Sequence, residues 1–271
     1  MRGIGEAGYI LSKSELCILA GMSGCKKLIG IDMNRPVEEK DLISELENVK
    51  SGLTAKKYLR KTDEGYAIDR NISFLIKVCC HPSVFVRFIE CREGIGRYRY
   101  YYFQNNIIVE LDQDLLLEDT FILTPMTSSE KAIRNMEEFF HIAQIRGKLD
   151  SRMFSNSFSI DHNTLTQMMD HDSDRVSEAG DMLSDAGLDS SLARDLLYAL
   201  KGSGESYSML LIKLGAAKTF HSSDIYAGKR YLWKVTGSQE QQGKDVISPG
   251  TREDMSFAAE QFIDIIKSIM S

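Results

Sequence analysis

The sequence predicts an α+β fold in which a pseudo-two-fold pair of antiparallel β-units forms a central sheet covered by helices. Two observations support this prediction. Stretches with strand character are grouped between stretches with helical periodicity, as in folds that segregate helices from sheet. The order helix, strand, strand, proline turn and long helix also occurs twice, and GRYRYYYF at 96–103 is echoed by GKRYLWKV at 228–235.

The repeat extends beyond this one phrase. Because the paired phrases keep their order at a near-constant spacing, we interpret the chain as two quasi-equivalent halves, 1–147 and 148–271, of one compact unit. The polar stretch at 147–159 is the predicted junction. The other two pairs are VFVRF at 84–88 with LLIKL at 210–214, and LTPMTSSEKAIRNMEEFF at 123–140 with ISPGTREDMSFAAEQFID at 247–264.

The first half begins with two predicted helices and a hairpin. Ser12 and Glu15 have the spacing of a capping box, so a helix is expected to begin there. A second helix is expected over 34–52, where Ser51-Gly52 would end it. Two short β-like runs on either side of the turn at 62–65 predict a hairpin.

The remaining elements follow from periodicity and turn residues. In the first half we expect a short buried helix, four strands and an amphipathic helix, at 70–80, 83–93, 97–104, 107–114, 119–126 and 128–145. In the second half we expect helices at about 160–170, 173–185 and 189–202, strands at 206–214 and 228–237, and a terminal helix that ends near 270.

The composition limits the class of protein. The net charge of −6 does not favour binding to a polyanion, and no stretch has the length and apolarity of a membrane span. The N-terminus lacks the apolar core of a signal peptide. We therefore expect a cytoplasmic protein without membrane insertion, whose cysteines are reduced thiols. The cysteines are Cys17, Cys25, Cys79, Cys80 and Cys91.

A winged-helix DNA-binding regulator is the alternative interpretation, and it would use residues 36–69. Two helices followed by a small hairpin resemble such a unit, and four basic residues near the hairpin could contact phosphates. However, the helix that would approach the DNA carries five carboxylates at 36–50, which would repel the phosphates. The four basic residues are Lys56, Lys57, Arg60 and Lys61.

The motifs of common catalytic and metal sites are incomplete. The segment 170–181 has aspartates at the first three positions of a calcium loop, but Arg175 occupies the position that requires glycine. The five histidines are scattered without a zinc-binding spacing, and the segment 204–209 lacks the second glycine of a nucleophile elbow. We therefore expect no enzyme activity, no metal site and no cofactor.

Aromatic residues on the strands are the candidate partner-binding residues. Side chains alternate between the faces of a strand, and we expect only one face to form core against the helices. The exposed face would then offer aromatic anchors to a partner, with the segment 216–227 as a loop beside it. Core packing is the other interpretation of the same residues. The candidates are Tyr98, Tyr100, Tyr102, Phe220, Tyr226, Tyr231 and Trp233.

The two ends of the chain resemble a known family. The phrase SSDIYAGKRYLWKVTG, followed by VISPGTREDMSFAAEQFIDII, is similar to the C-terminal strand, proline turn and last helix of EspG-type proteins. The opening LSKSELCILAGMSGCKKLIGI is similar to the first helix and turn of that family. The resemblance implies an EspG-like fold in a divergent Gram-positive relative.

The same resemblance implies a function. EspG-type proteins are cytosolic chaperones of ESX (type VII) secretion that bind the tip of helical-hairpin substrates. It therefore implies a chaperone or adaptor, monomeric or weakly dimeric, whose partner is a secreted helical-hairpin protein of the WXG or LXG type. No nucleic-acid partner is expected.

Overall fold

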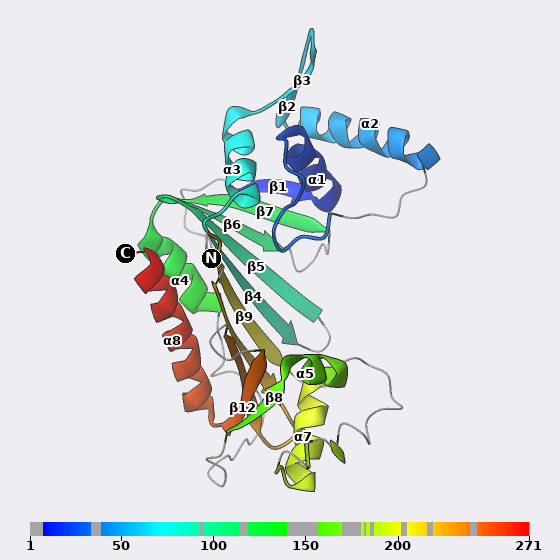
Figure 1. Ribbon diagram of the computed structural model, residues 1–271. Coiled ribbons are helices and arrows are strands. Elements are labelled where there is room, and N and C mark those ends of the chain that lie inside the picture. The colour runs from blue at the N-terminus through cyan, green and yellow to red at the C-terminus, as the bar shows by residue number, and fades with distance from the viewer. Residues whose placement is uncertain are drawn as a thin grey trace. The chain divides into compact units, whose positions relative to one another are not determined.

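A computed structural model describes most of the chain, and it divides into two compact units (Figure 1). Unit 1 comprises Met1–Phe85 and Arg99–Ala132, and unit 2 comprises Val86–Tyr98 and Ile133–Ser271. The boundary predicted between 147 and 148 lies outside the described residues. The described residues are 8–33, 39–92, 95–113, 119–139, 157–169, 180–181, 183–184, 187–201, 205–215, 219–238 and 243–270.

Helices and strands are segregated along the chain, as the sequence predicts. The helices are α1 (Lys13–Met22), α2 (Glu39–Ala55), α3 (Arg70–Cys80), α4 (Ser129–Phe139), α5 (His162–Met169), α7 (Ser190–Leu200) and α8 (Arg252–Met270). The strands are β1 (Tyr9–Ser12), β2 (Leu59–Thr62), β3 (Gly65–Ile68), β4 (Val84–Arg92), β5 (Ile95–Gln104), β6 (Ile107–Gln113), β7 (Thr120–Met126), β8 (Phe158–Asp161), β9 (Ser206–Lys213), β10 (Thr219–Ala227), β11 (Leu232–Ser238) and β12 (Lys244–Gly250).

The start of unit 1 follows its local sequence signals. Ser12 accepts a hydrogen bond from the backbone N–H of Glu15, and the Glu15 carboxylate accepts one from the backbone N–H of Ser12. This reciprocal pair is the predicted capping box. The hairpin β2–β3 forms where the turn predicts it, with Thr62 opposite Gly65. However, α2 runs three residues past the predicted end at Gly52 and stops before Lys57, whose φ is 62°.

The sheet of unit 1 has the strand order β1-β7-β6-β5, and the pairs β1–β7, β7–β6 and β6–β5 are antiparallel. On one face the Phe85 ring packs against Tyr100 and Tyr102, and the Tyr102 hydroxyl donates a hydrogen bond to the carbonyl of Ile29 at 2.8 Å. Helix α3 contacts β6. These contacts make this face of β5 part of the core.

The opposite face of β5 is also buried, which contradicts the expectation that only one face forms core. The Tyr101 hydroxyl donates to Glu110 at 2.8 Å, and Arg99 donates to Asp112 at 3.0 Å. Because these charged and hydroxyl groups bind one another, they can be removed from water at a much lower cost than unpaired groups. From Tyr100 to Phe103 every side chain is therefore buried.

The sheet of unit 2 has the strand order β4-β9-β10-β11-β12-β8. On one face, Phe88 packs against Phe139 of α4 and Phe262 of α8. These two helices lie side by side in Figure 1, and Lys267 pairs with Glu137 across them at 3.4 Å. On the other face, a buried cluster joins α5 and α7 to Trp233, Val235 and Ile247.

The element order of the first half recurs in the second half. The order β1-β7-β6-β5 corresponds to β8-β12-β11-β10. Strands β5, β6 and β7 begin at 95, 107 and 120, and β10, β11 and β12 begin at 219, 232 and 244, a spacing of 124 or 125 residues. A pseudo-two-fold relation between the halves stays a prediction.

Two details of the predicted repeat are wrong. The segment from 219 to 227 is strand β10, paired with both β9 and β11, and not a loop. GRYRYYYF therefore lies in the second of four strands, whereas GKRYLWKV leads into β11, the third of four. The prediction missed β10 because its central Ser222, Ser223 and Asp224 are residues that favour turns.

The cysteines also differ from the expectation. Cys25 and Cys80 form a disulfide in unit 1, between the segment after α1 and the end of α3, whereas Cys17, Cys79 and Cys91 are thiols. Burial raises the pKa of the Cys79 thiol, which keeps it protonated. The prediction of five reduced cysteines rested on compartment and spacing, and spacing cannot show which cysteines meet in the fold.

None of the described helices combines the length and apolarity that crossing a membrane requires.

Candidate functional site

The candidate site lies on the face of the unit 2 sheet that points away from α8, beside the part that α5 and α7 cover, and we call it the open face. Cross-strand pairing defines it on β9 and β10, where Phe220 lies opposite Ile212 and Ser222 lies opposite Leu210. Phe220 is 40% exposed, and Leu210 and Ile212 are partly exposed. Three apolar side chains thus reach solvent together at one end of two paired strands.

Strands β4 and β5 extend the open face. Phe88 packs against Phe262 of α8, so alternation directs its neighbour Ile89 to the open face. Phe85, on the same side of β4 as Ile89, packs against Tyr100 and Tyr102 of β5, so Tyr98 shares that side by alternation. Both residues belong to unit 2 and are partly exposed. The apolar part of the open face therefore consists of Ile89, Tyr98, Leu210, Ile212 and Phe220.

A polar cluster borders the apolar part. The pKa of Asp224 is raised to about 6: burial raises it most, a hydrogen bond from Ser208 and the Arg87 guanidinium lower it, and the nearby Asp245 carboxylate raises it. Arg87 precedes Phe88, which packs against Phe262 of α8, so alternation puts Arg87 on the side of the sheet that carries Asp224. Burial, and then Asp224 and Asp245, raise the pKa of the Tyr226 hydroxyl, which places that hydroxyl in the same cluster.

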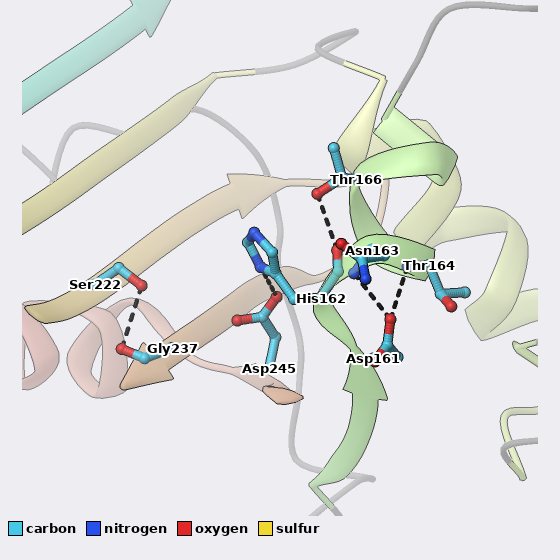
Figure 2. A network of polar contacts seen from close by, with 8 residues as sticks. All are labelled: Asp161, His162, Asn163, Thr164, Thr166, Ser222, Gly237 and Asp245. Atoms are coloured by element: carbon cyan, nitrogen blue, oxygen red, sulfur yellow. Dashed lines mark hydrogen bonds and ion pairs between the residues drawn. The ribbon is translucent and has the colours of Figure 1, made fainter. Parts of the chain in front are cut away.

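Figure 2 shows the contacts of Asp245, the residue of this polar cluster that lies on β12. His162 Nδ1 lies 2.8 Å from an Asp245 carboxylate oxygen, which links the start of α5 to β12. Asp161 accepts hydrogen bonds from the backbone N–H groups of Asn163 and Thr164, and so caps α5. The Ser222 hydroxyl donates to the carbonyl of Gly237 at 3.3 Å. The side-chain contact between His162 and Asp245 therefore holds the start of α5 against the sheet beside the open face.

The structure separates the seven predicted partner-binding residues into two groups. Tyr100, Tyr102 and Trp233 are between 0% and 5% exposed, so these three side chains are core and a partner cannot reach them in this structure. The four that keep exposed surface are Tyr98, Phe220, Tyr226 and Tyr231.

Only some of the exposed candidates lie together. The open face carries Tyr98 and Phe220, and its polar border includes Tyr226. The Tyr98 ring lies over Gly96, where an added Cβ would meet it at 2.9 Å. Tyr231 instead packs edge-on against Trp233, next to the cluster formed with α7.

Sequence reasoning missed Leu210 and Ile212 as site residues. The signal was the alternation in SYSMLLIKL, which puts Tyr207, Met209 and Leu211 on the buried face and leaves Leu210 and Ile212 on the other. The prediction considers aromatic residues only, and so it omits these two aliphatic residues.

The described contacts do not favour the DNA-binding alternative at 36–69. The Lys56 ammonium binds the Glu15 carboxylate at 2.7 Å and the Ile10 carbonyl at 3.2 Å, so it is occupied within the protein. Lys50 pairs with Glu47 on the acidic helix α2. The residues of the tested calcium loop at 170–181 lie mostly outside the described residues.

Comparison with known proteins identifies the fold. No protein-family model and no curated protein sequence matches this chain. Among solved structures, it is similar to the Mycobacterium tuberculosis type VII secretion system chaperone EspG5, solved in complex with a PE25-PPE41 dimer. The match has a TM-score of 0.54 and 11% sequence identity, and covers 95% of this chain and 96% of EspG5. The chain therefore has an EspG-like α+β fold.

Proposed function

We propose that this protein is a non-enzymatic chaperone or adaptor of type VII secretion that binds the apolar tip of a secreted helical-hairpin protein. The observation that carries the proposal is the open face, where the 40% exposed Phe220 stands beside the partly exposed Leu210 and Ile212. A sheet face that leaves neighbouring apolar side chains in water is a favourable place for a partner to bury its own apolar surface.

The EspG-like fold supports the same function. EspG5 is a chaperone and its structure was solved with a bound PE25-PPE41 dimer. A partner of the WXG or LXG helical-hairpin type would bring a compact apolar tip to the open face of this protein. The chaperone would act in the cytoplasm, because it would have to hold its client before export.

The chemistry of the open face fits reversible binding. Phe220 and Tyr98 are aromatic anchors of the kind that supply most of the binding free energy in protein interfaces. The polar cluster around Asp224 lies at the border and would limit how far an apolar segment can extend. Release of the client would then follow from competition or remodelling and would require no covalent step.

A matched pair of substitutions tests the proposal. Phe220→Asp places a charge on the open face, and Phe257→Asp makes the same change at a residue of α8 that is 57% exposed. Each variant is co-expressed with the helical-hairpin proteins encoded by neighbouring genes, and complexes are measured by size-exclusion chromatography and calorimetry. We expect Phe220→Asp to weaken binding about ten-fold or more, as loss of an interface anchor does, and Phe257→Asp to leave it unchanged.

Two outcomes would contradict the proposal. One is that none of these helical-hairpin proteins co-purifies with the wild-type protein. The other is that both substitutions change affinity equally, which would show that the client does not contact the open face.

A further inference from the structure

A small cavity lies on the opposite side of the same strands, beneath α8. Several side chains that β9 and β10 direct toward α8 are apolar and buried, such as Met209, Leu211 and Ile225. At one end of β10 and β11 the pattern changes to polar. Ser223 of β10 lies directly opposite Thr236 of β11. Lys234, two residues before Thr236 on β11, points to the same face. A polar group under a core-packed helix requires an explanation, because such positions normally carry apolar residues.

The polar side chains line a cavity. Ala258, Phe262 and Ile265 of α8 form the opposite, apolar wall, and the volume is about 170 Å³. A dry engineered cavity of about 150 Å³ in another protein binds benzene. The cavity beneath α8 therefore has room for a molecule about the size of one aromatic ring with a small substituent.

The hydroxyl group of Ser223 indicates that the cavity binds a ligand. This residue is 6% exposed, it lines the cavity, and its hydroxyl oxygen is buried with no hydrogen-bond partner among the described residues. Buried hydroxyl groups almost always have a partner. A ligand atom that accepts or donates a hydrogen bond would satisfy Ser223.

The charged residues that line the cavity determine whether an anion or a cation is favoured as the ligand. Lys234 contributes an ammonium group and His221 an imidazole, and none of the described lining residues carries a carboxylate. Hydrogen bonds from the backbone N–H and the hydroxyl of Thr251, and then the charge of Lys234, lower the pKa of Asp254, but Asp254 does not line the cavity. An anion is therefore favoured over a cation, and the apolar wall favours an anion with an apolar body.

We propose that this cavity binds a small organic acid of about the size of benzoate. Its carboxylate would lie against Lys234, Ser223 and Thr236, where it accepts charge-assisted hydrogen bonds. Its apolar body would lie against Phe262 and Ile265. The site is separate from the open face, because Phe220 and His221 are consecutive residues and point to opposite sides of β10.

An NMR titration of the full chain tests the proposal, with sodium benzoate as the probe and benzamide as the neutral control. We expect saturable shifts of the Ser223 and Thr236 backbone amide signals with a dissociation constant of about 1 mM or lower, a usual value for so small a ligand. Benzamide has the same shape without the charge, and we expect it to bind at least about five-fold less tightly.

Three variants locate the binding. Lys234→Met removes the charge from a partly exposed residue, and we expect an approximately ten-fold loss of benzoate affinity. Ala258→Leu fills the cavity while keeping Lys234, and we expect it to abolish binding. Lys213→Met is the control, since Lys213 is exposed at the end of β9 and does not line the cavity. Circular dichroism confirms that each variant is folded.

The proposal is overturned if benzoate gives no saturable shift at concentrations up to about 20 mM. It is also overturned if benzamide binds as well as benzoate, or if Ala258→Leu leaves benzoate binding unchanged. None of these results depends on a protein partner, so they do not bear on the proposed chaperone function.

Discussion

Trp233 donates its indole N–H to Asp195 at 2.9 Å, and the exposed fractions of these two residues are 1% and 6%. The same carboxylate accepts hydrogen bonds from the backbone N–H groups of Arg230 at 2.9 Å and Tyr231 at 3.3 Å. One aspartate of α7 therefore holds the turn that leads into β11. Gly228 is required there, because an added Cβ would clash with the Asp195 carboxylate.

Replacement of Asp195 should destabilise unit 2. Asp195→Ala leaves two backbone N–H groups and one indole N–H without their acceptor, and we expect the free energy of unfolding to fall by about 2–4 kcal/mol. Urea unfolding followed by tryptophan fluorescence measures this, because Trp233 is the only tryptophan of the chain. An unchanged midpoint would show that the turn holds without the carboxylate.

A control for the loss of charge is available on the same unit. Asp264 of α8 is 71% exposed at its side chain and pairs with Lys267 at 3.4 Å. Because exposed ion pairs stabilise little, Asp264→Ala is expected to cost at most about 0.5 kcal/mol. A similar loss in both variants would mean that net charge, and not the buried hydrogen bonds, accounts for the effect.

The pH dependence of stability should report the ionisation of the Asp224 carboxyl group. Its folded-state pKa of about 6 is above the ordinary value of 3.8, so the folded state binds more protons than the unfolded state between these two values. Stability should therefore fall as the pH rises from about 4 to about 6, and the loss should be complete above that range. Asp224→Asn, which cannot ionise, should be about 1–3 kcal/mol more stable than the wild type at pH 8 and no more stable at pH 4.

Urea unfolding at pH 4, 6 and 8 measures this difference between the two proteins. The prediction is contradicted if Asp224→Asn is less stable than the wild type at pH 8. That result would mean that the attraction between Asp224 and Arg87 outweighs the cost of burying the carboxylate.

Elements with local signals could be predicted from the sequence. The capping box of Ser12 and Glu15 and the hairpin turn between Thr62 and Gly65 depend on residues at most three positions apart, and both form as predicted. The α+β class and the EspG-like fold were also predicted correctly.

The candidate site was harder to predict, because exposure depends on residues far apart in sequence. Tyr102 packs against Phe85 and donates a hydrogen bond to the carbonyl of Ile29. Trp233 donates one to Asp195 of α7. Tyr98, in the same alternation as Tyr102, keeps exposed surface. Alternation assigns a side chain to a face of a strand, but only the packed fold decides which part of that face is covered.

The disulfide makes a prediction that a thiol count can check. With Cys25 and Cys80 paired, a thiol-reactive dye should detect three thiols in the denatured, unreduced protein and five after reduction. The crosslink joins residues 55 positions apart. Because it limits the unfolded chain, the double variant Cys25→Ser and Cys80→Ser should be about 2–4 kcal/mol less stable in urea unfolding.

Cys91→Ser provides the control, since Cys91 is a partly buried thiol outside the disulfide, and it should change stability by less than about 1 kcal/mol. Detection of five thiols before reduction would show that the pair is reduced in the isolated protein. Such a result would agree with the cytoplasmic location that the proposed function requires, because cytosolic proteins seldom keep disulfides.

The two interpretations of the aromatic residues can be separated by one pair of tyrosine variants. Tyr102 is fully buried and its hydroxyl donates to the Ile29 carbonyl, so Tyr102→Phe should lower the free energy of unfolding by about 1 kcal/mol. It should leave the affinity for the helical-hairpin client unchanged, because no client can reach that hydroxyl. Tyr98→Ala removes a partly exposed ring of the open face and should weaken client binding about five-fold or more. Calorimetric titration of both variants with the client, alongside urea unfolding, measures the two effects separately. If Tyr102→Phe weakens binding as much as Tyr98→Ala does, client binding must rearrange the core of β5, and the open face is not the whole binding surface.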